Sequence, residues 1–598
     1  MPFNTIPLPA PVRALRALAL TFALLAGCAA NQPKSAEAED EPQDEPETAA
    51  PAADPQAADP EAAKQTDLPK LDLSETILYE FLLAEIAGQR GNVGLAAQAY
   101  IDLAKRTRDP RIARRATEVA LYARMNNAAV EAAKIWYETE PDSQRPLQAL
   151  AGLLVAGGRY DEALPYLKKL LAATGSGPGN GFVQLTRTLA SAQDKKAALK
   201  LVQDAAADYP RLPEAHFAIA QAAGNAGEDR LALEEVRKAR ELRPDWEAAA
   251  LLEAQVLQKK SGDDALAVLA QFLKKYPDAR EVRLNYARML VAQKRLADAR
   301  SEFQKLLADF PSNTDVMFAV ALLSLQLNDY AAAETNLKRL LESNYRDKDN
   351  VRLYLGQAAE EQKNFPEALR WYGDVAEGEQ YVQAQIRYAQ VLSKEGKLEA
   401  ARAHLQQASA RSSEQRVQLI LAEAQLLRDA NQPKAGFDLL ARALDRLPND
   451  PDLLYDYAML AERIERIDIL ETSLRKLIEL RPEHAHAYNA LGYSLADRNQ
   501  RLPEAHELIE KALKLAPDDS FIIDSMGWVL FRMGDLKDAL GYLRRAFAGR
   551  PDPEIAAHLG EVLWALGERD EAERVWRDAS QKSPENETLV NTVKRLKH

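Results

Sequence analysis

Three histidines in the last quarter of the chain are the residues best suited to metal chemistry. His484 and His486 stand two residues apart, and His506 follows in the next helical segment. Neutral imidazoles can hold zinc, but zinc sites usually add cysteine or two histidines on one helical face, and neither accompanies these three. We therefore interpret them as surface histidines, with a metal enzyme as the alternative.

Other catalytic patterns do not occur in the sequence. The glycine-rich segment GSGPGNG at residues 175–181 lacks the Lys-Ser/Thr pair of a phosphate-binding loop, so we expect a flexible loop between helices there. No Gly-x-Ser-x-Gly pattern is present. The many acidic residues recur at helical spacing, which is typical of solvated helix faces. The sequence thus predicts no catalytic residues, no metal, no cofactor and a protein that is not an enzyme.

The one cysteine of the chain, Cys28, closes an export signal. Two arginines precede the apolar run ALALTFALLA, which is too short to span a bilayer, and the run ends in Leu-Ala-Gly-Cys. This ending resembles the lipobox of bacterial lipoproteins. The resemblance implies a signal peptide at residues 1–27 and lipid attached to Cys28. No aspartate follows the cysteine, and the resemblance then implies the periplasmic face of the outer membrane.

The segment after Cys28 has the composition of a tether. Residues 28–70 hold seven prolines, eleven acidic and three basic residues, and almost no large apolar side chain. Such a segment cannot form a core and is predicted to be a disordered, acidic Ala/Pro tether. The formal net charge of −13 argues against a nucleic-acid partner and against electrostatic binding to anionic lipid. We therefore expect membrane attachment through the lipid anchor only.

The clearest structural unit of the chain is SFIIDSMGWVLFRMGDLKDALGYLRRAFAGRP, residues 520–551. Its apolar and small residues step by three or four on both sides of a short turn, which predicts an antiparallel helical hairpin. Glycine inside a helix costs about 1 kcal/mol relative to alanine. At Gly527 we therefore expect the second helix to approach closely, at Ala539. The spacing of small, aromatic and proline residues resembles the tetratricopeptide repeat (TPR).

Prolines mark the repetition of this unit. They recur 33 to 35 residues apart in two series, at Pro210, Pro244, Pro277 and Pro311 and at Pro448, Pro482, Pro517, Pro551 and Pro584. This spacing predicts about fifteen hairpins in residues 71–584 and a capping helix in residues 585–598. The resemblance implies an all-α TPR solenoid, a right-handed superhelix whose inner wall consists of first helices.

The same resemblance suggests a binding surface. In tetratricopeptide repeats, the position after the small residue of the first helix and the position three beyond it face the inner wall. Carried onto the last four units, these positions are Met459, Glu462, Tyr493, Ala496, Trp528, Phe531, Glu561 and Trp564. The predicted partner-binding groove consists of Tyr493, Trp528, Phe531, Arg532 and Trp564, since aromatic and charged side chains are typical of such grooves. The alternative is that the aromatic residues pack between repeats.

Two C-terminal stretches carry a narrower resemblance. DSMGWVLFRMGDLKDALGYLRRAF and PDPEIAAHLGEVLWALGERDEAERVW are similar to the lipoprotein that binds a periplasmic carboxy-terminal processing protease. That resemblance implies a non-enzymatic adaptor that activates the protease and presents peptidoglycan hydrolases to it. The alternative is a TPR lipoprotein scaffold for another envelope machine, serving secretion, pilus or exopolysaccharide assembly.

Overall fold

The computed structural model describes residues 68–69, 71–173, 177–190 and 192–597. Cys28, the predicted signal peptide and all of the predicted tether except residues 68–69 lie outside these residues. The described residues form 31 helices and no strand. Consecutive helices pair into fifteen hairpins, and α32 follows the last of them. The predicted all-α repeat fold is confirmed.

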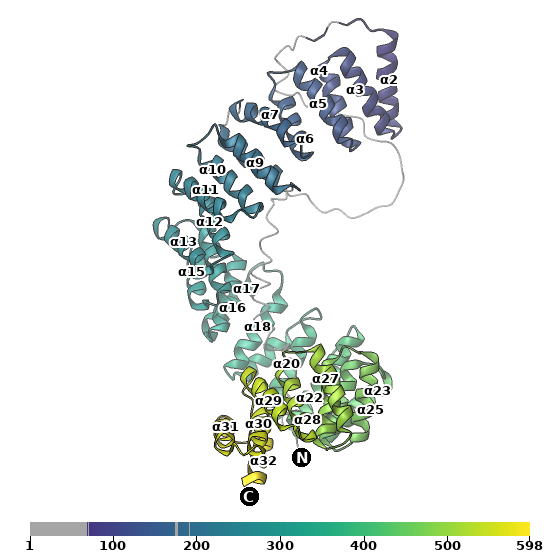
Figure 1. Ribbon diagram of the computed structural model, residues 1–598, viewed down its shortest axis with the longest axis vertical. Helices are drawn as coiled ribbons and strands as arrows, with labels where there is room; N and C mark the ends of the chain where they lie inside the picture. Colours follow the sequence, from purple (N-terminus) through teal and green to yellow (C-terminus); the bar gives the residue numbers. More distant parts are fainter. Residues whose placement is uncertain (1–67, 70, 174–176, 191, 598) are drawn as a thin grey trace. The chain divides into compact units, whose positions relative to one another are not determined.

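The chain divides into two compact units, one ending at Phe310 and the other beginning at Pro311. Figure 1 shows the helices of each unit following one another as a row of hairpins. The helices of the unit ending at Phe310 are α2 (Glu75–Gln89), α3 (Val93–Thr107), α4 (Pro110–Tyr122), α5 (Asn126–Thr139), α6 (Gln144–Ala156), α7 (Tyr160–Ala173), α8 (Pro178–Leu189), α9 (Lys195–Ala206), α10 (Pro213–Asn225), α11 (Asp229–Leu242), α12 (Glu247–Gln258), α13 (Gly262–Lys275), α14 (Arg280–Ala292) and α15 (Leu296–Asp309).

The unit beginning at Pro311 contains residues 520–551, the clearest copy of the repeat. Its helices are α16 (Thr314–Gln326), α17 (Tyr330–Glu342), α18 (Lys348–Glu361), α19 (Phe365–Gly373), α20 (Tyr381–Lys394), α21 (Leu398–Gln407), α22 (Ser413–Asp429), α23 (Pro433–Arg446), α24 (Pro451–Arg463), α25 (Ile467–Leu480), α26 (Ala485–Asp497), α27 (Leu502–Leu515), α28 (Ser520–Met533), α29 (Leu536–Gly549), α30 (Pro553–Ala565), α31 (Arg569–Lys582) and α32 (Glu587–Lys597). Even-numbered helices are the first helices of their hairpins, and odd-numbered helices are the second.

From the α14–α15 hairpin onward, each hairpin turn contains a residue in the left-handed backbone conformation. In α28, this residue is Gly534, with φ of 90°, and its N–H donates to the carbonyls of Leu530 and Phe531. Equivalent left-handed residues follow one another at 33 to 35 residue intervals through Lys294, Asn328, Lys363, Gly396, Asn431, Glu465, Asn499, Gly534 and Gly567. The repeat therefore continues without interruption where the boundary prolines are missing.

The small residues of the first helices let the two helices of a hairpin approach closely. A Cβ atom added at Gly527 would lie 2.6 Å from Leu543 Cγ and 3.1 Å from the carbonyl oxygen of Ala539. One repeat earlier, a Cβ atom at Gly492 would lie 2.6 Å from Ile509 Cγ1. The predicted contact of Gly527 with the second helix is confirmed.

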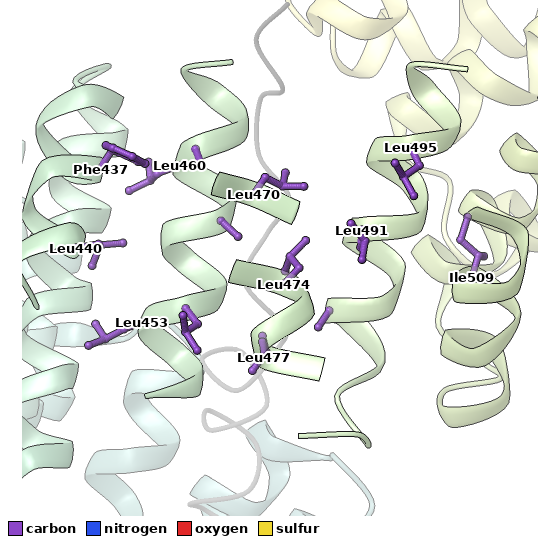
Figure 2. Packing of buried hydrophobic residues seen from close by; sticks show 14 of the residues in the cluster. Phe437, Leu440, Leu453, Leu460, Leu470, Leu474, Leu477, Leu491, Leu495 and Ile509 are labelled. Atoms are coloured by element: carbon purple, nitrogen blue, oxygen red, sulfur yellow. The ribbon is translucent and has the colours of Figure 1, made fainter. Parts of the chain in front are cut away.

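The apolar core consists of several clusters, each of which runs from helix to helix and not around a single centre. Figure 2 shows Leu453 and Leu460 of α24 facing the side chains of the helices before and after it, with Leu474 of α25 and Leu491 of α26 continuing the same layer. All four leucines are buried. Each helix thus gains its apolar contacts from its sequence neighbours, which is the packing expected of a repeat array.

Basic side chains donate hydrogen bonds to the carbonyls of the prolines at the repeat boundaries. The guanidinium of Arg339 donates to the carbonyl of Pro311 at 3.0 Å, and Lys476 Nζ donates to the carbonyl of Pro448 at 2.5 Å. In both pairs, the donor lies 28 residues after the proline, on the second helix of the following hairpin. The proline carbonyl, which follows a helix end, is thereby satisfied by the next repeat.

The glycine-rich segment at residues 175–181 is where the local prediction was wrong. Pro178 begins α8, at a position where its missing N–H is tolerated, and the chain is helical from there on. Gly181 lies inside this helix at a close contact, where a Cβ atom would come within 2.6 Å of Leu171 Cδ2. The expected loop therefore does not extend over residues 178–181, and residues 174–176 lie outside the described residues.

The last helix covers the end of the final hairpin. Leu589 of α32 is buried, and Val593 and Leu596 pack against the core that α30 and α31 form. Lys594, Arg595 and Lys597 lie in its last turn, where cations interact favourably with the helix dipole.

Candidate partner-binding site

The five residues of the predicted groove lie on three first helices of one unit. Tyr493 belongs to α26, Trp528, Phe531 and Arg532 belong to α28, and Trp564 belongs to α30. Helix α26 packs against α28, and α28 packs against α30. The fold therefore brings together side chains that are up to 71 residues apart in the sequence.

Trp528 does not line an open groove, contrary to our expectation. Its side chain is only 4% exposed, and its indole ring stacks on the imidazole of His558 with 4.2 Å between ring centroids. His558 lies on α30, so the following repeat covers the tryptophan. For Trp528, packing between repeats, which was the alternative interpretation, describes the structure.

Phe531, Arg532 and Trp564 keep part of their surface accessible, and we call these three residues the aromatic edge. The Phe531 ring lies 5.2 Å from the Trp528 ring, and the Arg532 guanidinium lies 5.7 Å from it, over its face. Phe531 and Trp564 both pack on the border of the core formed by the last two hairpins. Of the predicted groove, this edge and the partly exposed Tyr493 side chain are the parts that a partner can reach.

A hydrogen-bonded polar group lies buried behind the aromatic edge. His558 Nδ1 lies 2.9 Å from Asp524 Oδ2, and His558 Nε2 lies 3.4 Å from the Tyr493 hydroxyl. His558 and Asp524 are both nearly inaccessible. These contacts connect α26, α28 and α30 through one imidazole ring.

Burial and charge act in opposite directions on this group. Burial disfavours the charged form of His558, but the neighbouring Asp524 carboxylate outweighs it, and the pKa of His558 is raised. For Glu554, one turn earlier on α30, burial dominates and raises the pKa of the carboxyl to about 7. Burial also raises the pKa of the Tyr493 hydroxyl well above its usual value.

Sequence reasoning did not find His558 or its pairing with Asp524, although a signal for this pair exists. The two residues are 34 apart, one repeat length, so they occupy equivalent positions on successive first helices. Arg595 and Glu561 form an ion pair of 2.6 Å at the same separation. A search for complementary polar residues one repeat length apart would have identified both pairs.

Three buried polar atoms in this region make no hydrogen bond with the described part of the chain. They are Trp528 Nε1, Asn489 Oδ1 of α26 and Glu554 Oε1 of α30. Buried polar groups without partners are rare in folded proteins because losing hydration costs about 1 to 3 kcal/mol for each group. These first helices therefore carry three buried polar atoms for which the described repeats provide no hydrogen-bond partner.

Of the three histidines considered for metal binding, His484 and His486 lie near each other, with 6.4 Å between their ring centroids. His484 is the N-cap of α26, where its Nδ1 accepts from the N–H of Ala487 at 3.0 Å, and burial lowers the pKa of its ring. His486 Nε2 lies 3.9 Å from Asp519 Oδ2, and His506 belongs to α27. In the described ranges, no group of three or more His, Cys, Asp or Glu residues is arranged to hold a metal ion. Nor does any described helix have the length and apolar character to cross a membrane.

Comparison with known proteins identifies the repeat. Family models described as tetratricopeptide repeat match residues 147–180, 257–314, 319–381 and 409–592. A TPR repeat-containing protein, PA4667 of Pseudomonas aeruginosa, is 36% identical over 493 residues, which cover 82% of each chain. The chain belongs to the TPR family. TPR proteins are generally non-enzymatic scaffolds for protein–protein interaction, and the matching family models describe this repeat and no catalytic domain.

Solved structures resemble the fold of this chain only loosely. The Naa15/Naa10 complex bound to HypK-THB aligns with a TM-score of 0.37 at 15% identity, covering 66% of this chain and 67% of that one. TTC0263, a TPR protein of Thermus thermophilus, aligns with a TM-score of 0.28 at 23% identity, covering 30% of this chain and 99% of that one. These likenesses concern the fold alone.

Proposed function

We propose that this TPR scaffold is a lipid-anchored adaptor at the periplasmic face of the outer membrane, which binds and activates a carboxy-terminal processing protease and presents cell-wall hydrolases to it. The scaffold part of the proposal rests on the fold and the family. The partner and the location rest on the resemblance of the last two hairpins and on the Leu-Ala-Gly-Cys motif at Cys28. An adaptor of this kind raises the effective concentration of substrate near the protease by binding both.

The observation that carries the binding role is the aromatic edge. Phe531 and Trp564 leave aromatic surface accessible, and Arg532 places a cation beside it. Aromatic residues and arginine contribute most of the binding energy in many protein interfaces. Behind them, the buried contacts of His558 hold three helices together, so the edge is rigid before a partner arrives and loses little entropy on binding.

Capture from envelope extract tests the partner. The chain from residue 28 onward, with Cys28→Ser to prevent lipidation, is immobilised and the bound proteins are identified by mass spectrometry. We expect a carboxy-terminal processing protease together with peptidoglycan hydrolases, and faster cleavage of such a hydrolase when the scaffold is added to the purified protease. Recovery of secretion or exopolysaccharide-assembly proteins without a processing protease would support the alternative envelope scaffold and refute the adaptor.

A variant pair tests whether the aromatic edge is the contact surface. Phe531→Ala with Arg532→Ala removes partly accessible side chains, so we expect weaker capture with unchanged helicity. The control is Leu480→Ala on α25, which removes an exposed leucine away from the edge. Equal capture by the edge variant and the control would show that the partner binds elsewhere on the solenoid.

A further inference from the structure

The first described helix, α2, exposes an apolar surface that no other described helix matches. Of the sixteen large apolar side chains that are exposed among the described residues, nine precede residue 96. On α2, they form a stripe through Leu78 (43% exposed), Tyr79 (66%), Leu82 (47%) and Ile86 (46%). A contiguous apolar patch on a soluble domain usually marks an interaction site. We call these four residues the α2 stripe.

The stripe lies where a repeat array requires a polar surface. Ala84 and Ala87 on the opposite face of α2 are buried, and α2 packs on α3. The outer face of a terminal repeat has no neighbouring repeat and is normally polar. At the other end of the chain, α32 satisfies this requirement by covering the last hairpin. The α2 stripe does not satisfy it and therefore needs an occupant.

The chain preceding α2 does not supply that occupant, because its described leucines, Leu68, Leu71 and Leu73, are themselves exposed. Residues 29–67 contain no Val, Ile, Leu, Met, Phe, Trp or Tyr. The apolar run before Cys28 belongs to the predicted signal peptide, which the resemblance to lipoproteins removes from the mature protein. Helix α2 itself contains three glutamates and no lysine or arginine, whereas helices that lie on anionic membranes are rich in basic residues.

The charges at the two ends of the stripe fit a second copy of the same helix. Glu75 is exposed in the first turn of α2, and Arg90 is exposed at its C-cap. If two α2 helices pack antiparallel about a two-fold axis at Leu82, Leu78 of each copy faces Ile86 of the other. Glu75 of each copy then lies beside the Gln89–Arg90 end of the other, and the two helix dipoles oppose each other favourably. A two-fold interface uses the same patch twice, so complementarity within one helix is the property it requires.

We propose that the α2 stripe is a dimerisation surface on which two copies of this chain pack antiparallel through Leu78, Tyr79, Leu82 and Ile86. The interface is separate from the aromatic edge, which belongs to the other compact unit. A dimer formed in this way presents two copies of every repeat surface. It would therefore bind an oligomeric partner with avidity.

The oligomeric state of the chain from residue 28 onward, with Cys28→Ser, tests the proposal. It is measured by sedimentation equilibrium over micromolar protein concentrations. We expect a dimer, and we expect Leu78→Glu with Leu82→Glu to weaken dimerisation about a hundredfold or more because like charges meet across the axis. The matched control is Leu480→Glu with Leu515→Glu, which changes two leucines of similar exposure on α25 and α27. A chain that stays monomeric throughout, or a stripe variant that dimerises as well as the control, would overturn the proposal.

Cysteine cross-linking tests the axis without depending on stability. In the Cys28→Ser background the chain contains no other cysteine, so Leu82→Cys places one thiol of each copy at the proposed axis. We expect a disulfide-linked dimer on mild oxidation and far slower cross-linking of Leu480→Cys. Equal rates at both positions would refute the antiparallel pairing.

Charge reversal tests the direction of packing. Glu75→Arg and Arg90→Glu should each weaken the dimer several-fold, and the two together should restore it, since the ends are complementary again. Additive weakening in the double variant would contradict the antiparallel arrangement. Binding of the monomer to phosphatidylethanolamine–phosphatidylglycerol vesicles that is lost on changing the stripe would assign it to a membrane surface and overturn the dimer.

Discussion

Two glycines of the same hairpin predict opposite effects of one added methyl group. Gly527 of α28 faces α29, and Gly541 of α29 has no other atom within 4 Å of the place where a Cβ atom would stand. Alanine is favoured over glycine inside a helix by about 1 kcal/mol at either position. The difference between the two substitutions therefore measures the closeness of the helices in this hairpin.

The structure gives the size of the opposing effect at Gly527. The added methyl group would lie 2.6 Å from Leu543 Cγ and 3.1 Å from the Ala539 carbonyl oxygen, both far inside normal contact distance. Leu543 is fully buried and the Ala539 oxygen belongs to a helix backbone, so neither can move freely. Overpacking of this kind costs about 1 to 3 kcal/mol. After subtraction of the propensity gain, we expect Gly527→Ala to destabilise the hairpin by up to about 2 kcal/mol and Gly541→Ala to stabilise it by up to about 1 kcal/mol.

The assay must resolve one hairpin, because long repeat arrays do not unfold in a single two-state step. Hydrogen exchange followed by mass spectrometry provides this resolution through peptides from α28 and α29. A loss of about 1.4 kcal/mol corresponds to roughly tenfold faster exchange of the amides that open together. Exchange in Gly527→Ala that is as slow as in Gly541→Ala would refute the close packing of α28 on α29.

The remaining predictions concern the buried carboxyl group and the lipid anchor. Burial raises the pKa of Glu554 to about 7, so the folded state holds this proton more tightly than the unfolded chain does. The contribution of the Glu554 proton to stability is complete below about pH 4.5 and is lost as the pH rises through 7. Glu554→Gln should therefore remove this pH dependence from hydrogen exchange in α30, once the exchange rates are corrected for intrinsic rates. An unchanged pH profile in the variant would contradict the raised pKa of Glu554. Cys28→Ala should transfer the protein from the membrane fraction to the soluble fraction, as judged by immunoblotting; retention on the membrane would refute the predicted anchor.

The hairpins were predictable because the signals that define them are local. Pro551 and Gly527 mark a helix boundary and a close helix contact within one repeat, and both roles are confirmed by the structure. Between Pro311 and Pro448 the sequence signal fades. There, left-handed residues such as Lys363 and Asn431 close the turns, and unlike glycine they do not stand out in a sequence.

The site was less predictable because it depends on contacts between repeats. The assignment of Trp528 to the inner wall considered its own helix, whereas its burial is caused by His558 of the next first helix. Similarly, the leucines of α2 have the pattern of a buried helix, and their exposure follows from the lack of a preceding repeat in the described residues. Packing between neighbours is a property of pairs of repeats, which a pattern within one repeat does not contain.

The repeat length itself explains which inner-wall residues stay accessible. A side chain on a first helix is covered by the residue about 34 positions later, as Asp524 is covered by His558. The residue 34 positions after Phe531 is Ala565, which is too small to cover an aromatic ring. Phe531 therefore stays accessible because the residue at its covering position is small, whereas Asp524 is buried because that position holds His558.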